Sequence, residues 1–181
     1  MKLIGVAGAK GVGKDTFFNV LKSRLMPVQR IAFADCIKAD VSQLPGIEGA
    51  TKEDIRAIYQ EYGEVAKKLQ GSDYWLDRLK PVLSALDTSK ATIVTDVRFK
   101  FEAEWINQQG GVVVVVTRPG SDGDDHVSEQ DWRQIDADHQ IENFSSRQLY
   151  AQAVVETWEL IKRNSVVRDY RITQNKQSIG A

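Results

Sequence analysis

Apolar residues along the chain form short continuous runs, separated by segments in which they recur every three or four positions. Runs of this kind predict β-strands, and the longer spacing predicts helices with one buried face. The clearest run is 112–116, five valines in succession, which is typical of a strand buried on both faces of a parallel sheet. The predicted strands cover residues 2–7, 28–33, 91–95, 112–116 and 140–141. The predicted helices cover residues 16–25, 34–44, 52–69, 73–86, 101–108 and 146–163.

Two helices carry further signals. Thr51 followed by Glu53 and Asp54 is a typical helix start, because a hydroxyl caps the first amides and acidic residues suit the positive end of the helix. The last predicted helix shows one apolar stripe, formed by Leu149, Ala153, Val154, Trp158 and Ile161. Residues 164–181, which follow this helix, are polar and predict a loose tail.

Alternation of strands and helices predicts an α/β fold in three layers, with a mostly parallel five-stranded sheet between helices. The chain of 181 residues and 20.3 kDa is long enough for one buried core, so we expect a single domain over 1–181. The stretch 34–88 is longer than a simple crossover between strands requires and predicts a helical insertion. Residues 118–135, after the fourth strand, predict a lid.

Between the first strand and the first helix, residues 8–16 follow the pattern G-x-x-x-x-G-K-[ST] with one departure, Asp15 in place of the hydroxyl residue. Glycines allow the backbone to turn its N–H groups toward one point, and the helix N-terminus adds positive potential there. The lysine of the pattern reaches the β and γ phosphates of a nucleotide. We therefore predict a nucleoside triphosphate site built by Gly11, Val12, Gly13, Lys14, Asp15 and Thr16.

Two roles stay open for Asp15. Its carboxylate is suited to bind Mg²⁺, with Thr16 supplying the hydroxyl contact. The same carboxylate is suited to act as a general base that takes the proton from an attacking alcohol. An acceptor phosphate is already anionic at neutral pH and needs no strong base, whereas an alcohol acceptor benefits from one. The sequence does not choose between these roles.

Polar residues that follow the strands are expected at one edge of the sheet. Asp35, Asp96 and Arg118 follow three predicted strands, and Lys14 opens the first helix at the same edge, where ligands bind in this architecture. Asp96 is interpreted as a ligand of nucleotide-bound Mg²⁺, with a cap of the following turn as the alternative. Arg118 is placed to bring a cation over the phosphates.

Other candidates depend more on context. Arg98 is placed to contact a transferred or acceptor phosphate, or else pairs with Glu102 on the surface. His126 and Glu129 lie in an acidic segment, and for His126 alone a surface position is favoured. Asn143 follows the last strand, where base or ribose contacts occur, but a turn-forming role is equally compatible.

Composition narrows the functional classes. The net charge of −1 provides no global electrostatic footprint for nucleic acid. The single Cys36 excludes an intrachain disulfide and a metal site built of cysteines. No apolar run approaches the roughly 18 residues that span a bilayer, and no signal-peptide pattern opens the chain, so we expect a cytoplasmic protein without a membrane partner. A homodimer is left open.

Several motifs together resemble the bacteriophage deoxynucleoside monophosphate kinases, within the nucleoside monophosphate kinase group of P-loop proteins. The G-K-D-T sequence at 13–16 is similar to the unusual loop of that family, and Ala34-Asp35 with Lys38 is similar to its A-D-x-x-K segment. The D-V-R-F-x-x-E-A-E stretch at 96–104 and H-x-S-E at 126–129 match further features, as do Asp138 and Asn143. Phe99-Lys100-Phe101 departs from the family, which has a Pro-Asn pair there, and the chain is short for it.

The resemblance implies a P-loop kinase fold and Mg²⁺-dependent transfer of the γ-phosphoryl group of ATP to a deoxynucleoside monophosphate, in an infected host cell if the gene is viral. It implies that the 34–88 insertion binds the acceptor. The implied catalytic residues are Lys14, Asp15, Asp35, Arg98 and Arg118, and the implied Mg²⁺ ligands are Asp15, Thr16 and Asp96. Acceptor contacts fall on Asp35, Lys38, Arg56, Tyr74, Trp75, Arg98, His126 and Glu129, although Arg56 and Trp75 are equally compatible with a surface charge and a core aromatic.

Two other functions compete with this one. A related phage kinase would phosphorylate the hydroxymethyl group of 5-hydroxymethyluracil in DNA, with Asp15 as general base and Tyr74 and Trp75 as a platform for the extruded base. The basic residues 52, 56, 67 and 68 would then contact DNA phosphates. A nucleotide-binding protein without turnover is the second competitor, and the presence of Lys14 and Asp96 argues against it.

Overall fold

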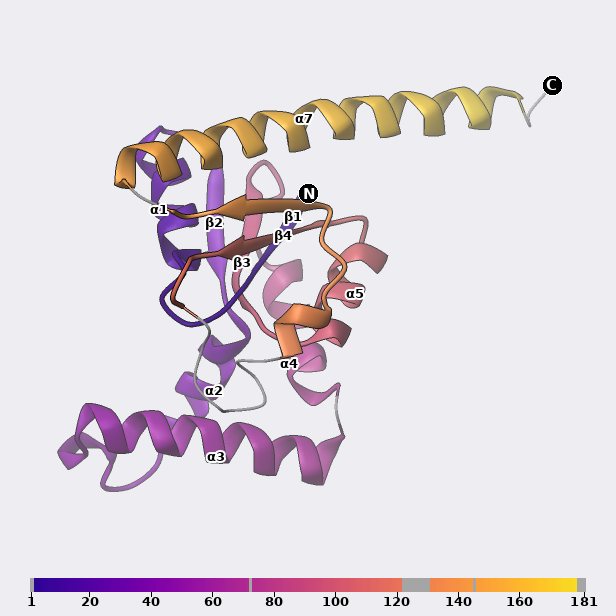
Figure 1. Ribbon diagram of the computed structural model, residues 1–181. Coiled ribbons are helices and arrows are strands. Elements are labelled where there is room, and N and C mark those ends of the chain that lie inside the picture. Colours follow the sequence, from indigo (N-terminus) through magenta and orange to yellow (C-terminus); the bar gives the residue numbers. More distant parts are fainter. Residues whose placement is uncertain (1, 72, 122–130, 145, 179–181) are drawn as a thin grey trace.

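The computed structural model describes residues 2–71, 73–121, 131–144 and 146–178, with side chains described up to residue 164. Its centre is a five-stranded sheet in the order β2-β3-β1-β4-β5, and all four strand pairings are parallel (Figure 1). The strands are β1 Leu3–Ala7, β2 Val28–Ile31, β3 Ala91–Val97, β4 Val112–Thr117 and β5 His139–Glu142. The predicted α/β class and the parallel five-stranded sheet are therefore confirmed.

Helices cover both faces of this sheet. The α-helices are α1 Lys14–Ser23, α2 Phe33–Val41, α3 Lys52–Gln70, α4 Tyr74–Ser84, α5 Lys100–Gln108 and α7 Arg147–Ser178, and the short 3-10 helices are η1 Ile47–Gly49 and η2 Asp131–Gln134. In Figure 1, α7 runs along one side of the molecule and α3 lies at the opposite end, away from the sheet.

Alternating side chains of the strands fill two hydrophobic cores. In β1, Leu3 and Ala7 point into the core under α4 and α5, whereas Ile4 and Val6 point into the core under α1 and α7. The valines of β4 divide between the two cores in the same way, as a strand buried on both faces requires. The sheet is thus fixed from both sides, and its carboxyl edge provides a rigid base for the loops.

The predicted insertion consists of α2, η1, α3 and α4. Thr51 begins α3 as expected: its hydroxyl accepts a hydrogen bond from the Asp54 amide at 3.2 Å, and Asp54 accepts one from the Thr51 amide at 3.2 Å. Arg78 of α4 donates to Asp40 of α2 at 2.7 Å and so ties these two helices together. This contact therefore joins the first and last helices of the insertion to each other.

Several boundaries differ from the predictions. Asp96 lies inside β3 instead of directly after it, and β2 ends at Ile31, so that α2 begins earlier than predicted. The predicted loose tail is wrong for residues 164–178, where α7 continues to Ser178, because no glycine or proline interrupts this segment. Leu149 is 59% exposed and Tyr150 takes its place in the buried stripe.

Part of the predicted lid, together with His126 and Glu129, lies outside the described residues. No helix in the described parts of the chain is long and apolar enough to cross a membrane.

Candidate active site

The loop between β1 and α1 has the backbone shape that its glycines predict. Gly13 caps α1 with a φ of 114°, a conformation that L side chains rarely adopt. Gly8 has a φ of 136°, and a Cβ added there would lie 2.1 Å from the carbonyl oxygen of Val116. These two glycines let the loop pass close to β4 and place the N-terminus of α1 at the carboxyl edge of the sheet.

Lys14 stands in the first turn of α1 and folds back over the loop. Its Nζ donates hydrogen bonds to the carbonyl oxygens of Gly8 at 2.6 Å and Ala9 at 2.7 Å. The ammonium group therefore lies above the centre of the loop, where the sequence predicts the phosphates of a nucleotide.

Two side chains hold the loop from behind. Asn143, after β5, donates through Nδ2 to the carbonyl oxygen of Val12 at 2.7 Å, and the Tyr150 hydroxyl donates to the carbonyl oxygen of Gly13 at 2.9 Å. A Cβ on Gly13 would lie 3.0 Å from Asn143 and 3.1 Å from Tyr150. The structure thus shows Asn143 supporting the loop, whereas the predicted base or ribose contact stays a prediction.

Tyr150 was not singled out by the sequence analysis. It is buried, and burial raises the pKa of its phenol above the ordinary value, so the hydroxyl stays protonated and remains a donor. The only sequence signal for it is its place in the apolar stripe of the last helix.

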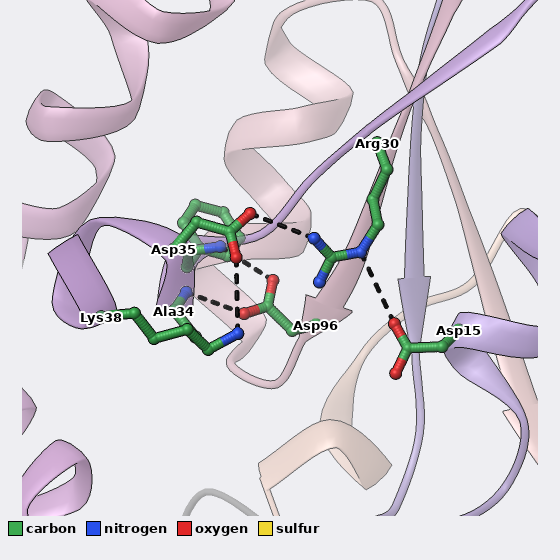
Figure 2. Close-up of polar contacts among 7 residues, drawn as sticks. Asp15, Arg30, Ala34, Asp35, Lys38 and Asp96 are labelled. Carbon is green, nitrogen blue, oxygen red and sulfur yellow. Dashed lines mark hydrogen bonds and ion pairs between the residues drawn. The ribbon is translucent and has the colours of Figure 1, made fainter.

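A chain of charged side chains connects the loop to α2 (Figure 2). Arg30 Nε lies 3.6 Å from the Asp15 carboxylate, and Arg30 Nη1 lies 3.2 Å from the Asp35 carboxylate. Lys38 Nζ lies 3.4 Å from the other oxygen of Asp35. The sequence predictions for Asp15, Asp35 and Lys38 thus fall on one cluster.

Arg30 was missed by the sequence analysis. It is the one charged residue in the predicted strand 28–33, and a charge near the carboxyl end of a strand is the signal that could have identified it. In the structure it lies in β2 and reaches both Asp15 and Asp35.

Asp96 caps the N-terminus of α2. One carboxylate oxygen accepts from the Phe33 amide at 2.9 Å and the other accepts from the Ala34 amide at 2.9 Å (Figure 2). The sequence offered a cap of the following turn as the alternative to Mg²⁺ binding, but the capped helix precedes β3 in the chain. Burial raises the pKa of this carboxyl, and the two amide hydrogen bonds oppose that effect. Its predicted role as a metal ligand stays a prediction.

A pocket opens beside this cap, between the insertion and the turn from β3 to α5. Its walls come from α2, α3 and α4, and its lining includes Asp96 and Arg98. Ala7 at the end of β1 is opposite Val97 in the parallel pairing, so this pocket lies next to the start of the loop. Aromatic and aliphatic residues dominate the rest of the lining, among them Phe33, Ile37, Tyr59, Trp75, Phe99 and Phe101.

Glu102 fixes the turn that carries Arg98. Its Oε2 accepts hydrogen bonds from the backbone amides of Arg98 at 2.8 Å and Phe99 at 3.1 Å. Glu102 is 6% exposed, and burial is the main cause that raises its pKa to about 8. The sequence alternative was a surface pair between the Arg98 and Glu102 side chains, whereas Glu102 is buried and its hydrogen bond is to the backbone amide of Arg98. Arg98 itself lines the pocket.

The predicted acceptor residues differ in their positions. Trp75 is buried, lines the pocket and donates through Nε1 to the carbonyl oxygen of Gly63 at 3.2 Å. Tyr74 lies against Trp75 outside the described pocket lining, and its hydroxyl accepts from Arg78 at 3.1 Å. Arg56 is exposed on α3, one turn before Gln60 and on the helix face that lines the pocket.

Arg118 is exposed directly after β4, at the same edge as the loop. Within the described residues, no three histidine, cysteine, aspartate or glutamate side chains form a ready metal site. The carboxylate of Asp15 and the hydroxyl of Thr16 are both exposed in the first turn of α1, beside Lys14.

The whole architecture is similar to that of two solved structures, one of which is a kinase. Shikimate kinase from Aquifex aeolicus superposes with a TM-score of 0.52 at 14% identity, over 87% of this chain and 96% of that one. TT1252 from Thermus thermophilus gives a TM-score of 0.52 at 18% identity, over 89% of this chain and 97% of that one. The fold, together with the glycine-rich loop and Lys14 at its centre, defines a P-loop kinase.

The sequence comparison specifies the family. Residues 49–153 match the deoxynucleotide monophosphate kinase family, and the chain belongs to that family. A protein of Acanthamoeba polyphaga mimivirus named "Putative deoxynucleotide monophosphate kinase" is 29% identical over 163 residues, covering 75% of this chain and 84% of that protein. The chain is thus a nucleotide kinase, as the motif resemblance implied.

Proposed function

We propose that this kinase transfers the γ-phosphoryl group of ATP to the phosphate of a free deoxynucleoside monophosphate. An oxygen of the acceptor phosphate attacks the γ phosphorus, the bond to the β–γ bridging oxygen breaks, and ADP and a deoxynucleoside diphosphate leave. One observation carries the proposal: the loop with Lys14 and the pocket with Arg98 lie side by side at the ends of β1 and β3.

On the donor side, Lys14 exchanges its two carbonyl partners for the β and γ phosphates of ATP. The loop amides and the N-terminus of α1 supply further hydrogen bonds and positive potential. Lys14 then stabilises negative charge on the transferred group, which is the main task of a protein in phosphoryl transfer.

The donor residues fit Mg²⁺. This ion usually binds one or two carboxylates together with substrate phosphates and water, and Asp15 with Thr16 offers a carboxylate and a hydroxyl at that place. When bound with ATP, Mg²⁺ neutralises phosphate charge. We assign Asp15 to this role because an anionic acceptor phosphate brings no proton that a base must remove.

On the acceptor side, the insertion at 34–88 supplies most of the pocket. Its aromatic and aliphatic lining suits the flat faces of a nucleobase, and Arg98 suits the acceptor phosphate because guanidinium binds phosphate in a bidentate manner. Arg56 extends the same face of α3 toward solvent, and Arg118 approaches from the end of β4. Walls from three helices favour a small free nucleotide over a base within duplex DNA.

A labelling assay tests the proposal. With γ-labelled ATP and Mg²⁺, we expect label in the diphosphate of at least one deoxynucleoside monophosphate and none in duplex DNA that carries hydroxymethyluracil. Label in DNA alone would refute the proposal and support a hydroxymethyl kinase. ATP binding without transfer to any acceptor would indicate a protein without turnover.

Three variants assign the two halves of the site. Lys14→Ala is expected to lower kcat by about 10²- to 10³-fold, a typical loss for a group that stabilises transition-state charge. Arg98→Met is expected to raise KM for the acceptor at least tenfold with little change in the Kd of ATP. Arg24→Met, which removes an exposed arginine at the far end of α1, is the matched control and is expected to behave like the wild type.

A further inference from the structure

Arg30 is the residue that joins the donor side of the site to the acceptor side. Asp15 belongs to the first turn of α1, beside Lys14. Asp35 belongs to the first turn of α2 and directly follows Phe33 and Ala34, which line the acceptor pocket although Asp35 itself does not. The guanidinium lies between them, 3.6 Å from the Asp15 carboxylate and 3.2 Å from that of Asp35 (Figure 2).

This bridge contributes little to the stability of the fold. The side chains of Asp15, Arg30 and Asp35 are 76%, 33% and 44% exposed. Exposed ion pairs contribute little to stability and often nothing measurable. These contacts of Arg30 therefore matter more for the geometry and charge of the site than for the stability of the fold.

Arg30 is surrounded by negative charge in the site. ATP and a monophosphate bring several negative charges to the edge where Asp15 and Asp35 already stand. The planar guanidinium offers donors on different nitrogens, so that one side chain contacts both carboxylates at once through Nε and Nη1. Lys38 also lies near Asp35, but only Arg30 among these described contacts reaches Asp15 as well.

We propose that Arg30 is a positioning residue, which holds the Asp15 carboxylate in register with the acceptor side of the site during phosphoryl transfer. The naming of the two sides rests on the proposed function. Arg30 acts through Asp15 and Asp35, and its loss leaves two carboxylates without a common partner at the place where the phosphates meet.

A double-mutant cycle tests this coupling. Arg30→Met is expected to lower kcat about 10- to 100-fold with less than a threefold change in the KM of ATP, because small misplacements of a reactive group carry losses of this size. The kcat of Arg30→Lys is expected to lie between that of the wild type and that of Arg30→Met, since an ammonium group is a point charge that cannot span both carboxylates. The double variant Arg30→Met/Asp15→Asn should be no slower than Asp15→Asn alone, because both changes disrupt the same contact.

The matched control is Lys80→Met, which removes an exposed 2.6 Å pair with Asp77 on α4. It should retain the wild-type kcat, and all variants should melt within a few degrees of the wild type. A kcat of Arg30→Met within twofold of the wild type would overturn the proposal. So would losses that multiply in the double variant, because independent effects imply that Arg30 does not act through Asp15.

Failure of the proposed function gives a different result. In that case the wild type labels no deoxynucleoside monophosphate, and the same variants are compared by ADP release from ATP without an acceptor. Arg30→Met and Asp15→Asn should lower that rate, and their combination should lower it no further. Multiplying losses or an unchanged rate in Arg30→Met would then overturn the coupling by itself.

Discussion

Glu102 shows how a single buried carboxyl shapes the proposed acceptor side of the site. Both backbone amides of the Arg98–Phe99 turn point to its Oε2, so the turn keeps one conformation while Arg98 lines the pocket. Burial in this place opposes ionisation and raises the pKa to about 8. The side chain therefore carries a proton over much of the range in which its exposed counterpart is ionised.

This shift predicts a pH dependence of stability. A carboxyl whose pKa is raised on folding binds more protons in the folded state, so its stabilising contribution is complete below its ordinary pKa of 4.5 and is lost as the pH rises to about 8. Glu102→Gln keeps an oxygen that accepts from the two amides and has no proton to lose. Relative to this variant, the wild type is expected to lose about 4 kcal/mol of unfolding free energy across that window.

Urea unfolding of both proteins at several pH values measures this difference. Asp96, whose pKa burial also raises, is present in both proteins, so the comparison reports on Glu102 and its coupling to Asp96. Parallel stability curves for wild type and variant between pH 5 and 8 would show that Glu102 ionises in the folded protein as it does in the unfolded chain.

At the scale of elements, α7 contributes to the donor loop although it lies at the other end of the sequence. Tyr150, in its first turn, donates to the carbonyl oxygen of Gly13, and Asn143 before it donates to that of Val12. These contacts order a loop whose glycines would otherwise allow many conformations. The loop thus enters ATP binding already shaped.

Tyr150→Phe isolates one of these contacts. Removal of the hydroxyl is expected to lower the unfolding free energy by about 1 kcal/mol and to raise the Kd of ATP a few-fold, because the Gly13 carbonyl loses its partner. Calorimetric titration with ATP and urea unfolding check the two effects. Tyr59→Phe, on α3, is the matched control for loss of a phenol outside the loop and should leave the Kd of ATP unchanged. If Tyr150→Phe bound ATP with the same Kd as the wild type, the hydrogen bond from Tyr150 to Gly13 would have no role in nucleotide binding.

Local sequence predicted the elements well and the contacts between distant elements poorly. The valine run of β4, the Thr51 cap and the glycine-rich loop were predicted because each signal is complete within a few residues. The Asp96 cap joins β3 to α2 across 62 and 63 positions, and the Asn143 contact spans 131, so no local pattern announces them. Arg30 was missed for a different reason: its partners lie nearby in the sequence, but only the fold brings Asp15 on α1 and Asp35 on α2 to the same guanidinium.

At the scale of the whole molecule, the sheet order explains how distant residues meet. The loop follows β1, and β1 lies between β3 and β4, so Lys14 stands between the ends of the strands that lead to Arg98 and Arg118. The insertion follows β2 at the edge of the sheet, next to β3, which places its pocket beside that centre. The arrangement of the proposed donor and acceptor sides is thus a consequence of topology.

The second half of α7 has a different relation to the molecule. The described side chains of α7 that enter the core end at Ile161, whose carbonyl accepts a hydrogen bond from Lys2 at 2.8 Å. In Figure 1, the helix then runs on past the sheet as far as Ser178. The proposed catalytic edge lies elsewhere, at the carboxyl ends of the strands.

A chain that stops after Asn164 is therefore expected to fold and to phosphorylate its acceptor at the wild-type rate. The melting temperature should stay within a few degrees, because Tyr150, Val154, Trp158 and Ile161 all remain. A chain that stops after Ala153 is the matched comparison. It loses Val154, Trp158 and Ile161 and should fail to fold, since deletion of even one large core side chain costs about 2–5 kcal/mol. Loss of folding or of kinase activity in the longer truncation would show that residues 165–181 take part in the domain, and the boundary drawn at Ile161 would then be wrong.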